Sequence, residues 1–447
     1  MKIVIIGGGP AGLSTALKLH RAGYEISVLE ASGYTRPRAG EHLAAKGHLL
    51  LRDLGIPESI WLDQSIPCRV VQGAWGKSEL GEEASIYNPY GEGYILSRPG
   101  FDWAVFEYCR SIGIDVRKNF HARILVRTSL GWKISDGKQD IQADFVVDAS
   151  GRNSKFYQTF KSDRTAEDEL IGISMILEPA VPAAPNGTSL LVESLSNGWW
   201  YSVQLPSGKL VATLMTDAST LSSSGEKQAA FWASNLAQST HTRQRTIGFQ
   251  HDGKPFTQSA KTQSIERVAG PDWIAVGDAA ISYDPLSSAG ILKGLEMGQL
   301  AGTRLDEFSR GHATALAEYE GEVKAMYADY LLEKDRVYAR EQRFMNHPFW
   351  YRRLLKPTSI QQFSILPQQH LAVSKERHER RLEYLAIHLP TIDFNSLTEA
   401  FGKYGVTHLA MGDYLRRKGE QEIGIHHFQA LESLKMIGIL EPVAQGN

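Results

Sequence analysis

The chain has 447 residues, enough for two or three domains of about 150 residues and for a large apolar core. Its 48 lysine and arginine residues balance 50 aspartate and glutamate residues, and the net charge of −2 argues against a general binder of nucleic acids or anionic membranes. Hydrophobic residues make up 42% and charged residues 22%, the composition of an ordinary globular protein rather than a disordered one.

The sequence also limits the chemistry and the cellular compartment. Cys68 and Cys109 are the only cysteines, too few for a disulfide framework or a zinc site. The N-terminal apolar run stops at Gly7, too soon for a signal peptide, and no stretch reaches the roughly 18 apolar residues of a membrane span. We therefore expect a cytoplasmic protein without a metal site and without nucleic-acid or membrane partners.

The first thirty residues predict a βαβ unit. An apolar run at residues 3–6 is followed by a glycine turn, a helix at 10–22 and a second strand at 25–29. A continuous rather than alternating apolar run is typical of a strand with helices on both faces. The unit therefore indicates a parallel sheet.

The turn of this unit carries the spacing G-x-G-x-x-G at Gly7, Gly9 and Gly12. Gly7 permits the tight turn, Gly9 lets the backbone approach a pyrophosphate, and Gly12 allows close packing of the helix on the strand. The helix N-terminus adds free N–H groups and a positive dipole end. Glu30 ends the next strand, where a carboxylate can bind ribose hydroxyls. The unit predicts a dinucleotide site without deciding between NAD and FAD.

Similar elements return later in the chain. A helix at 42–54 precedes strand-like stretches within 66–98, and a helix at 101–112 with strands at 114–116 and 144–148 then resumes the sheet. The return of this pattern predicts that one domain is discontinuous in sequence.

The middle and the end of the chain have different patterns. Residues 170–265 contain strand-like runs at 171–177, 199–205 and 210–215, with a further candidate at 245–250, and they are separated by polar loops and one helix at 227–237. These runs predict an antiparallel sheet. A strand at 273–276 and a helix at 290–305 again belong with the first domain. Apolar residues spaced by three and four between 316 and 337 predict a long amphipathic helix.

These elements predict an α/β protein with an inserted sheet. The Rossmann domain comprises residues 1–65, 99–160 and 262–305. The inserted antiparallel sheet, a substrate domain, comprises residues 66–98 and 161–261. A helical C-terminal region comprises residues 306–447.

Two later segments resemble fingerprints of the FAD-dependent aromatic hydroxylase superfamily. They are Val146-Val147-Asp148-Ala149-Ser150-Gly151-Arg152 and Ile274-Ala275-Val276-Gly277-Asp278-Ala279-Ala280. The resemblance covers residues 1 to about 305 and implies FAD bound to a Rossmann domain of the glutathione-reductase type. It also implies that Asp278 accepts hydrogen bonds from the ribityl chain. Residues 285–290 lead into a helix whose N-terminus can stabilise negative charge on the flavin.

Finer positions extend the resemblance. Arg38 and Glu41 lie in a segment similar to the one where an arginine and a Gly-Glu pair approach the cofactor in this superfamily. Arg98 matches an arginine that reaches FAD in relatives, and Ile291 would offer its backbone to the flavin ring. The predicted cofactor-binding residues are Gly7, Gly9, Ala11, Gly12, Glu30, Arg38, Glu41, Arg98, Asp278, Gly290 and Ile291.

Within the superfamily the chain most resembles flavin-dependent tryptophan halogenases and their non-halogenating relatives. The latter include bacterial flavoproteins that mature tryptophylquinone cofactors in partner amine dehydrogenases or amino-acid oxidases. The segments that carry this resemblance are residues 74–76, 198–206 and 284–290. Halogenases have a Trp-x-Trp-x-Ile-Pro element, but Pro206 is displaced here, which argues against halogenation. Lys77 lies near the position of the lysine that halogenases need, although its polar surroundings also fit a surface lysine.

The predicted catalytic residues are His42, Trp199, Tyr201 and Pro285. Trp199 and Tyr201 would form an aromatic wall for an indole, although aromatic residues on a strand also fit a hydrophobic core. His42 would act as a base on the substrate side of the flavin, or would be a packing histidine.

These features predict an FAD-dependent monooxygenase that hydroxylates an aromatic carbon through a flavin C4a-hydroperoxide formed from O2. The resemblance implies that the substrate is a tryptophan side chain of a partner protein or peptide during tryptophylquinone biogenesis. One alternative is a halogenase or hydroxylase of a free aromatic metabolite, and another is a flavin-containing chaperone without oxygen chemistry. The reductant, NAD(P)H or reduced flavin from a separate reductase, stays undecided because only one dinucleotide fingerprint is present.

A basic stretch suggests how a partner could dock. Residues 334–381 contain eleven lysine or arginine residues and four acidic residues. The stretch could bind an acidic partner protein. It also fits a solvated helix face that balances an acidic body.

Overall fold

The computed structural model describes residues 1–85, 88–181, 189–250, 254–354, 363–365 and 440–442. Contacts divide the chain into two compact units, residues 1–356 and 357–447. The second unit is described only by strands β24 (Phe363–Ile365) and β25 (Leu440–Pro442), which pair antiparallel. The rest of the predicted helical C-terminal region beyond residue 354, and with it the second half of the basic stretch, lies outside the described residues.

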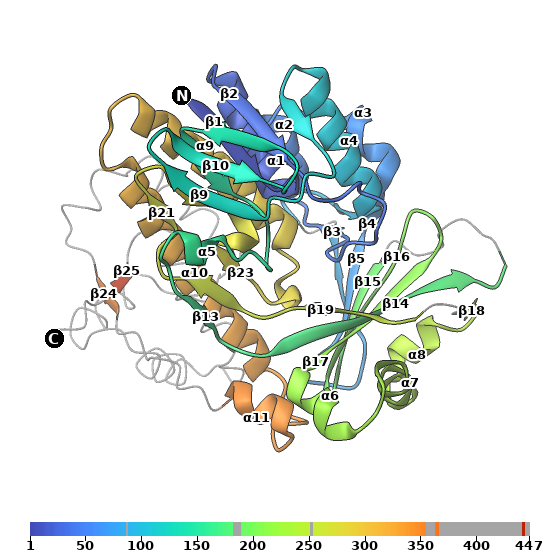
Figure 1. The fold of residues 1–447 in the computed structure, drawn as a ribbon. Coiled ribbons are helices and arrows are strands. Elements are labelled where there is room, and N and C mark those ends of the chain that lie inside the picture. Colours follow the sequence, from blue (N-terminus) through green and yellow to red (C-terminus); the bar gives the residue numbers. More distant parts are fainter. Residues whose placement is uncertain (86–87, 182–188, 251–253, 355–362, 366–439, 443–447) are drawn as a thin grey trace. The chain divides into compact units, whose positions relative to one another are not determined.

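A six-stranded sheet forms the centre of the Rossmann-type part, in the order β21-β22-β12-β1-β2-β8 (Figure 1). Pairs from β22 to β8 are parallel, and β21 is antiparallel to β22. The strands are β1 (Lys2–Ile6), β2 (Glu25–Leu29), β8 (Asp115–Arg117), β12 (Phe145–Asp148), β21 (Ala269–Gly270) and β22 (Trp273–Ala275). The predicted parallel sheet is confirmed. Because β22, β12 and β1 are neighbours, the three fingerprints that follow them meet at one edge.

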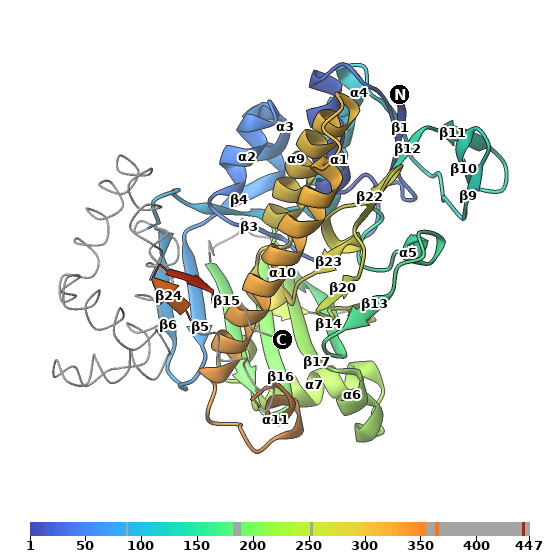
Figure 2. The ribbon, with the colours of Figure 1, turned by 90° about the vertical axis from the view of Figure 1, so that its left-hand side faces the viewer.

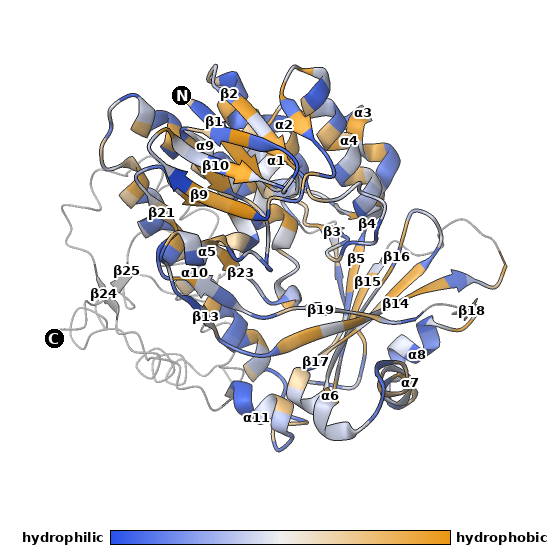
Figure 3. Cartoon of the chain, in the orientation of Figure 1, coloured by the Kyte–Doolittle hydropathy of each residue, from blue (hydrophilic) through white to orange (hydrophobic). Residues whose placement is uncertain are grey.

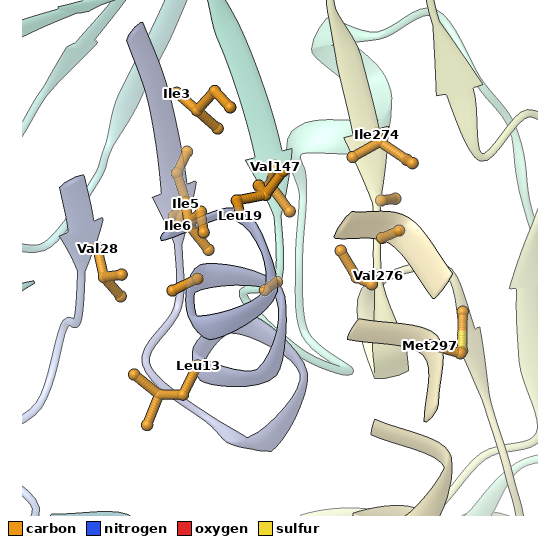
Figure 4. Packing of buried hydrophobic residues seen from close by; sticks show 14 of the residues in the cluster. Ile3, Ile5, Ile6, Leu13, Leu19, Val28, Val147, Ile274, Val276 and Met297 are labelled. Atoms are coloured by element: carbon orange, nitrogen blue, oxygen red, sulfur yellow. The ribbon is translucent and has the colours of Figure 1, made fainter. Parts of the chain in front are cut away.

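Helices pack on this sheet and bury its apolar strands. Ile3, Val4 and Ile5 of β1 are fully buried, and Figure 4 shows Ile5 next to Leu19 of the first helix. Gly298 brings two helices together, since a β-carbon there would lie 2.6 Å from the carbonyl oxygen of Ala11. The helices of this part are α1 (Pro10–Arg21), α2 (Gly47–Asp53), α3 (Glu58–Trp61), α4 (Arg98–Ser111), α5 (Phe156–Thr159), α9 (Gly290–Ser309) and α10 (Ala315–Ala339).

A second, eight-stranded sheet has the order β18-β14-β17-β16-β15-β5-β6, with β19 also paired to β14. All its pairs are antiparallel except β5 with β15. Figure 3 shows the long hydrophobic stretch of β14 in this sheet. The strands are β5 (Val70–Ala74), β6 (Gly81–Ala84), β14 (Leu170–Pro179), β15 (Ser189–Leu195), β16 (Gly198–Gln204), β17 (Leu210–Asp217), β18 (Phe249–Gln250) and β19 (Phe256–Ser259).

Different helices pack on the two faces of this sheet. On one face Trp200 packs against Trp232 of α7 (Gln228–Gln238), next to α6 (Ala218–Ser224) and α8 (His241–Arg245). On the other face lie the C-terminal end of α10 and α11 (Pro348–Leu354), which Figure 2 shows below the long α10. Helix α10 therefore contacts both the Rossmann-type part and the large sheet.

Smaller sheets complete the unit. They are β9 (Ile124–Thr128) with β10 (Gly131–Ser135) and β11 (Asp140–Ala143); β3 (His42–Leu43) with β4 (Ser65–Cys68) and β7 (Gly93–Leu96); and β13 (Arg164–Ala166) with β20 (Gln263–Ile265) and β23 (Ile281–Ser282).

Two local predictions were wrong. The predicted helix at 42–54 begins as strand β3, because residues 42–43 pair with β7, and helix starts only at Gly47. Residues 245–250 are not one strand, since α8 ends at Arg245 and only Phe249 and Gln250 pair with β14. None of the helices in the described part of the chain is both long enough and apolar enough to span a membrane.

Candidate active site

A cavity of about 840 Å³ extends from the glycine loop after β1 to the large sheet. At the sheet it is lined by β14, β16, β17 and β19. The predicted site residues that line it are Gly7, Gly9, Ala11, Glu30, Arg38, Glu41, His42, Arg98, Tyr201, Asp278, Pro285, Gly290 and Ile291. Gly12 and Trp199 are not among the lining residues. The cavity therefore brings together residues separated by up to 284 positions in the sequence.

The glycine loop has the geometry of a phosphate-binding turn. Gly7 has φ +115°, and a β-carbon there would lie 2.1 Å from the carbonyl oxygen of Ala149. Gly12 packs on this turn, because its β-carbon would lie 1.9 Å from the oxygen of Gly7. Gly9 precedes α1, has no protein atom near its β-carbon position, and leaves the first N–H groups of the helix without a side-chain cap. These donors can bind an anion.

Glu30 directly follows β2, and its carboxylate is held by contacts with the glycine loop and with Arg38. Its Oε2 accepts a hydrogen bond of 2.8 Å from the N–H of Gly8, and its Oε1 pairs with Arg38 at 2.8 Å. Arg38 also pairs with the buried Asp102 at 2.9 Å, and Arg98 pairs with the same carboxylate at 3.0 Å. Asp102 was missed in the sequence, although Arg98 and Asp102 have the i, i+4 spacing of a helical ion pair.

Asp278 lies in η3 (Gly277–Ala279), directly after β22. Its Oδ1 pairs with Lys293 at 2.6 Å and its Oδ2 with Arg152 at 3.1 Å. Burial alone would raise the pKa of Asp278, but the two cations outweigh it and lower the pKa to about 2. The carboxylate is therefore ionised and keeps part of its surface open to the cavity. Arg152 and Lys293 were not predicted as site residues, although Arg152 stands in the second fingerprint.

Glu41, His42 and Tyr201 also line the cavity. Burial raises the pKa of Glu41. Burial, and after it the charge of Glu41, raises the pKa of Tyr201 well above its ordinary value. The Tyr201 hydroxyl and His42 Nδ1 are both buried without a well-formed hydrogen bond to any described residue. Such unsatisfied polar atoms are costly in a protein interior and indicate groups available to a ligand.

Acid should destabilise the protein through His42. Burial lowers its pKa from 6.5 to about 4, so between these values the unfolded chain binds a proton that the folded protein excludes. The contribution of the neutral His42 ring to the free energy of unfolding is thus complete above about pH 6.5 and is lost as the pH falls toward 4. Between pH 7 and pH 5, we expect the free energy of unfolding of the parent to fall by about 1–2 kcal/mol more than that of the His42→Gln variant. Urea unfolding at both pH values measures the difference, and equal losses would contradict it.

Trp199 is not part of the cavity wall, which corrects the prediction of an aromatic wall that includes it. Its strand neighbour Met215 lines the cavity, and the two residues pair directly in adjacent strands. However, Trp199 is covered by α10, where its indole N–H donates a 3.0 Å hydrogen bond to Tyr338. Trp199 is therefore a core residue, and Tyr201 alone of this pair lines the cavity.

Pro285 lies in η4 (Pro285–Ser287), whose position depends on the preceding residue. Asp284 is fully buried, accepts a 2.9 Å hydrogen bond from the N–H of Leu286, and accepts another of 2.7 Å from the Tyr338 hydroxyl. Ser288 then has φ +50°, and α9 begins at Gly290 with its first N–H groups at the cavity. Asp284 and Tyr338 thus tie this loop to α10.

Comparisons with known proteins agree with this geometry. A family model described as an FAD binding domain matches residues 1–330. The putative FAD-dependent oxidoreductase LodB of Marinomonas mediterranea is 28% identical over 358 residues, covering 78% of this chain and 96% of LodB.

Solved structures similar to this one include a peptidyl tryptophan dihydroxylase and a flavin-dependent halogenase. The structure of QhpG, a peptidyl tryptophan dihydroxylase essential for tryptophylquinone cofactor biogenesis, has a TM-score of 0.67 and 26% identity, covering 80% of this chain and 79% of QhpG. CmlS, a flavin-dependent halogenase, has a TM-score of 0.74 and covers 100% of this chain and 96% of its own, but at 18% identity it shows the fold alone.

The donor set fits FAD. The open position of Gly9 at a free helix N-terminus suits a pyrophosphate, the carboxylate of Glu30 suits a ribose, and the ionised Asp278 suits a hydroxylated chain further along the cavity. With the match over residues 1–330, these features show that the chain belongs to the FAD binding domain family and is an FAD-dependent oxidoreductase.

Proposed function

We propose that this enzyme is a monooxygenase that hydroxylates a tryptophan side chain of a partner protein or peptide, as a step in tryptophylquinone cofactor formation. The observation that carries the proposal is the continuous cavity, which joins the dinucleotide loop to a wall formed by Tyr201, Thr213 and Met215. The likeness to QhpG, at 26% identity, supports a peptidyl tryptophan as the substrate.

The chain's own residues would hold and orient FAD along the cavity. The loop of Gly7, Gly9 and Ala11 binds the pyrophosphate, and Glu30 binds the adenosine ribose. Arg38, Glu41, Arg98 and Asp278 contact the remainder of the cofactor, and Gly290 and Ile291 present the N-terminus of α9 to the ring. FAD supplies the activation of O2, with electrons from NAD(P)H or reduced flavin.

His42 and Tyr201 would accept protons and hydrogen bonds from the substrate. An aromatic carbon that gains oxygen must lose its proton, and the His42 ring is neutral at physiological pH because burial lowers its pKa to about 4. His42 thus accepts this proton, while the Tyr201 hydroxyl oxygen accepts a hydrogen bond from the indole N–H. Pro285 limits the cavity on the side of α9.

The test uses the purified holoenzyme with a candidate partner precursor, NAD(P)H or reduced flavin, and ¹⁸O₂. We expect peptide mass spectrometry to find one or two labelled oxygen atoms on a tryptophan of the partner. A chlorinated product in the presence of chloride would instead support the alternative that the enzyme is a halogenase. Partner binding without any modification would leave only a chaperone.

Replacement of Lys77 should separate hydroxylation from halogenation. Lys77 is exposed in the loop between β5 and β6, and among the described residues no lysine lines the cavity. The loop is fixed to α10 and the residues after it, since Gly76 N–H donates to Glu341 and Trp75 donates to the carbonyl of Val337, both at 2.8 Å. We expect Lys77→Ala to keep turnover within about twofold, because surface substitutions are usually near neutral. A loss of activity in a steady-state assay would favour halogenase chemistry.

A further inference from the structure

We propose that the cavity contains a binding site for the main chain of an extended peptide, formed by the free edge of strand β19. The peptide would add to the large sheet as an extra strand beside β19, with its tryptophan on the cavity face of the sheet, which also carries Tyr201. This inference rests on the proposed function, because it states how a polypeptide substrate is held in the cavity.

The pairing of β19 leaves one of its edges open. Within the described part of the chain, β19 pairs with β14 and with no other strand, and Figure 1 shows it alongside β14. The N–H of Ala260 donates to the carbonyl of Leu170 at 2.9 Å, in the same register as the strand. Because hydrogen-bonded positions alternate in an antiparallel pair, Gln258 also faces β14, whereas Thr257 and Ser259 direct their N–H and C=O groups outward.

These outward groups belong to residues that line the cavity. Thr257 and Ser259 lie directly opposite Ile173 and Ile171, which pack with the Trp200 cluster on the far face of the sheet. Directly opposed residues share a face, so the side chains of Thr257 and Ser259 also point to that far face. Both residues nevertheless line the cavity. They therefore contribute main-chain atoms to the cavity wall.

The edge has no partner in the described structure. Apart from the ladder with β14, no hydrogen bond among the described residues uses the N–H or C=O of Thr257 or Ser259. Unpaired groups on a strand edge are a template for an added strand. Residues two apart on a strand repeat at about 6.6 Å, a spacing that an extended peptide matches but a single small aromatic molecule does not.

The wall beside this edge leaves room for a side chain from the added strand. Gly172 and Ser174 of β14, and Thr213 of β17, are small residues on the cavity face. Alternate side chains of an added strand point to the same face as Gln258, the face of the sheet on which these residues and Tyr201 also lie. A tryptophan at such a position would enter the cavity while its neighbours stay bound to β19.

The test compares proline and alanine at the two outward positions of the full-length holoenzyme. Thr257→Pro/Ser259→Pro removes two outward N–H groups and leaves the ladder with β14, since proline is tolerated at the outward positions of an edge strand. Thr257→Ala/Ser259→Ala is the control, because it keeps both N–H groups. The probes are acetyl-tryptophanamide and a fluorescent nine-residue peptide of threonine and serine with a central tryptophan.

We expect the proline variant to bind the peptide roughly tenfold more weakly, the loss expected for two main-chain hydrogen bonds, with the alanine variant unchanged. Acetyl-tryptophanamide should bind all three proteins equally. A second measurement avoids any folding defect: N-methylation of the residues flanking the tryptophan should weaken binding to the parent enzyme by a similar factor. The proposed peptide site at the free edge of β19, here called the strand site, is overturned if the peptide does not bind, if the proline and alanine variants act alike, or if N-methylation has no effect.

Oxygen incorporation in the same samples separates this inference from the proposed function. A peptide that binds through β19 but gains no oxygen contradicts the proposed function and leaves the strand site in place. Equal hydroxylation of the peptide by the parent and the proline variant overturns the strand site and leaves the proposed function in place.

Discussion

Replacing Gly9 by alanine is expected to remove FAD from the enzyme while leaving the protein folded. The β-carbon of this alanine would meet no protein atom within 4 Å, and Gly9 has φ −86°, which alanine adopts readily. The new methyl group instead occupies the space where the loop approaches the pyrophosphate. We expect FAD affinity to fall by roughly 100-fold, which corresponds to about 2.7 kcal/mol. The free energy of unfolding of the apoprotein should change by no more than about 1 kcal/mol, the cost of alanine at a helix N-cap.

Two other glycine variants serve as controls for this result. In Gly12→Ala the β-carbon would lie 1.9 Å from the oxygen of Gly7, so both stability and FAD binding should be lost. In Gly321→Ala, within α10, nothing lies within 4 Å, so FAD binding should be unchanged and stability should rise by up to about 1 kcal/mol. Flavin titration and urea unfolding measure both quantities. Normal FAD binding by Gly9→Ala would show that the pyrophosphate does not cross this loop.

The difference between these glycines shows what the sequence could predict. The motif at residues 7–12 is local, because strand, turn and helix follow one another in the chain, and its spacing alone predicts the turn. The sequence does not reveal that Gly7 packs on Ala149 while Gly9 faces open space, since that depends on β12 pairing beside β1. The motif could be read from the sequence, but the separate effects of its members required the fold.

Trp199 shows the limit of periodicity in the large sheet. Alternation correctly separates Trp199 and Tyr201 from Trp200, which packs on the far face against Trp232. It cannot show that α10, about 140 residues later in the chain, covers Trp199 and leaves Tyr201 at the cavity. Arg152 and Lys293 were missed for the same reason, because their ion pairs with Asp278 join β12, β22 and α9 through tertiary contacts.

Removing the carboxylate of Asp278 is expected to destabilise the protein strongly, because it leaves a buried cation. The Lys293 side chain is only 2% exposed and pairs with Asp278 at 2.6 Å. Breaking a buried ion pair from one side costs about 3–5 kcal/mol, whereas replacing both partners can be nearly neutral. Asp278→Asn should therefore lower the free energy of unfolding by at least about 3 kcal/mol. Adding Lys293→Met to it should restore most of that stability.

In the Asp278 and Lys293 variants, FAD affinity should not recover together with the free energy of unfolding. The double variant Asp278→Asn/Lys293→Met lacks the ionised acceptor, so we expect it to fold but to bind FAD weakly. Because the pKa of Asp278 is lowered from 3.8 to about 2 in the folded protein, its contribution to stability is complete above about pH 4 and is lost as the pH falls toward 2. Urea unfolding across this range should show a shallower acid loss in the double variant than in the parent. If the second substitution failed to rescue Asp278→Asn, the destabilisation would have a cause other than the unpaired charge of Lys293.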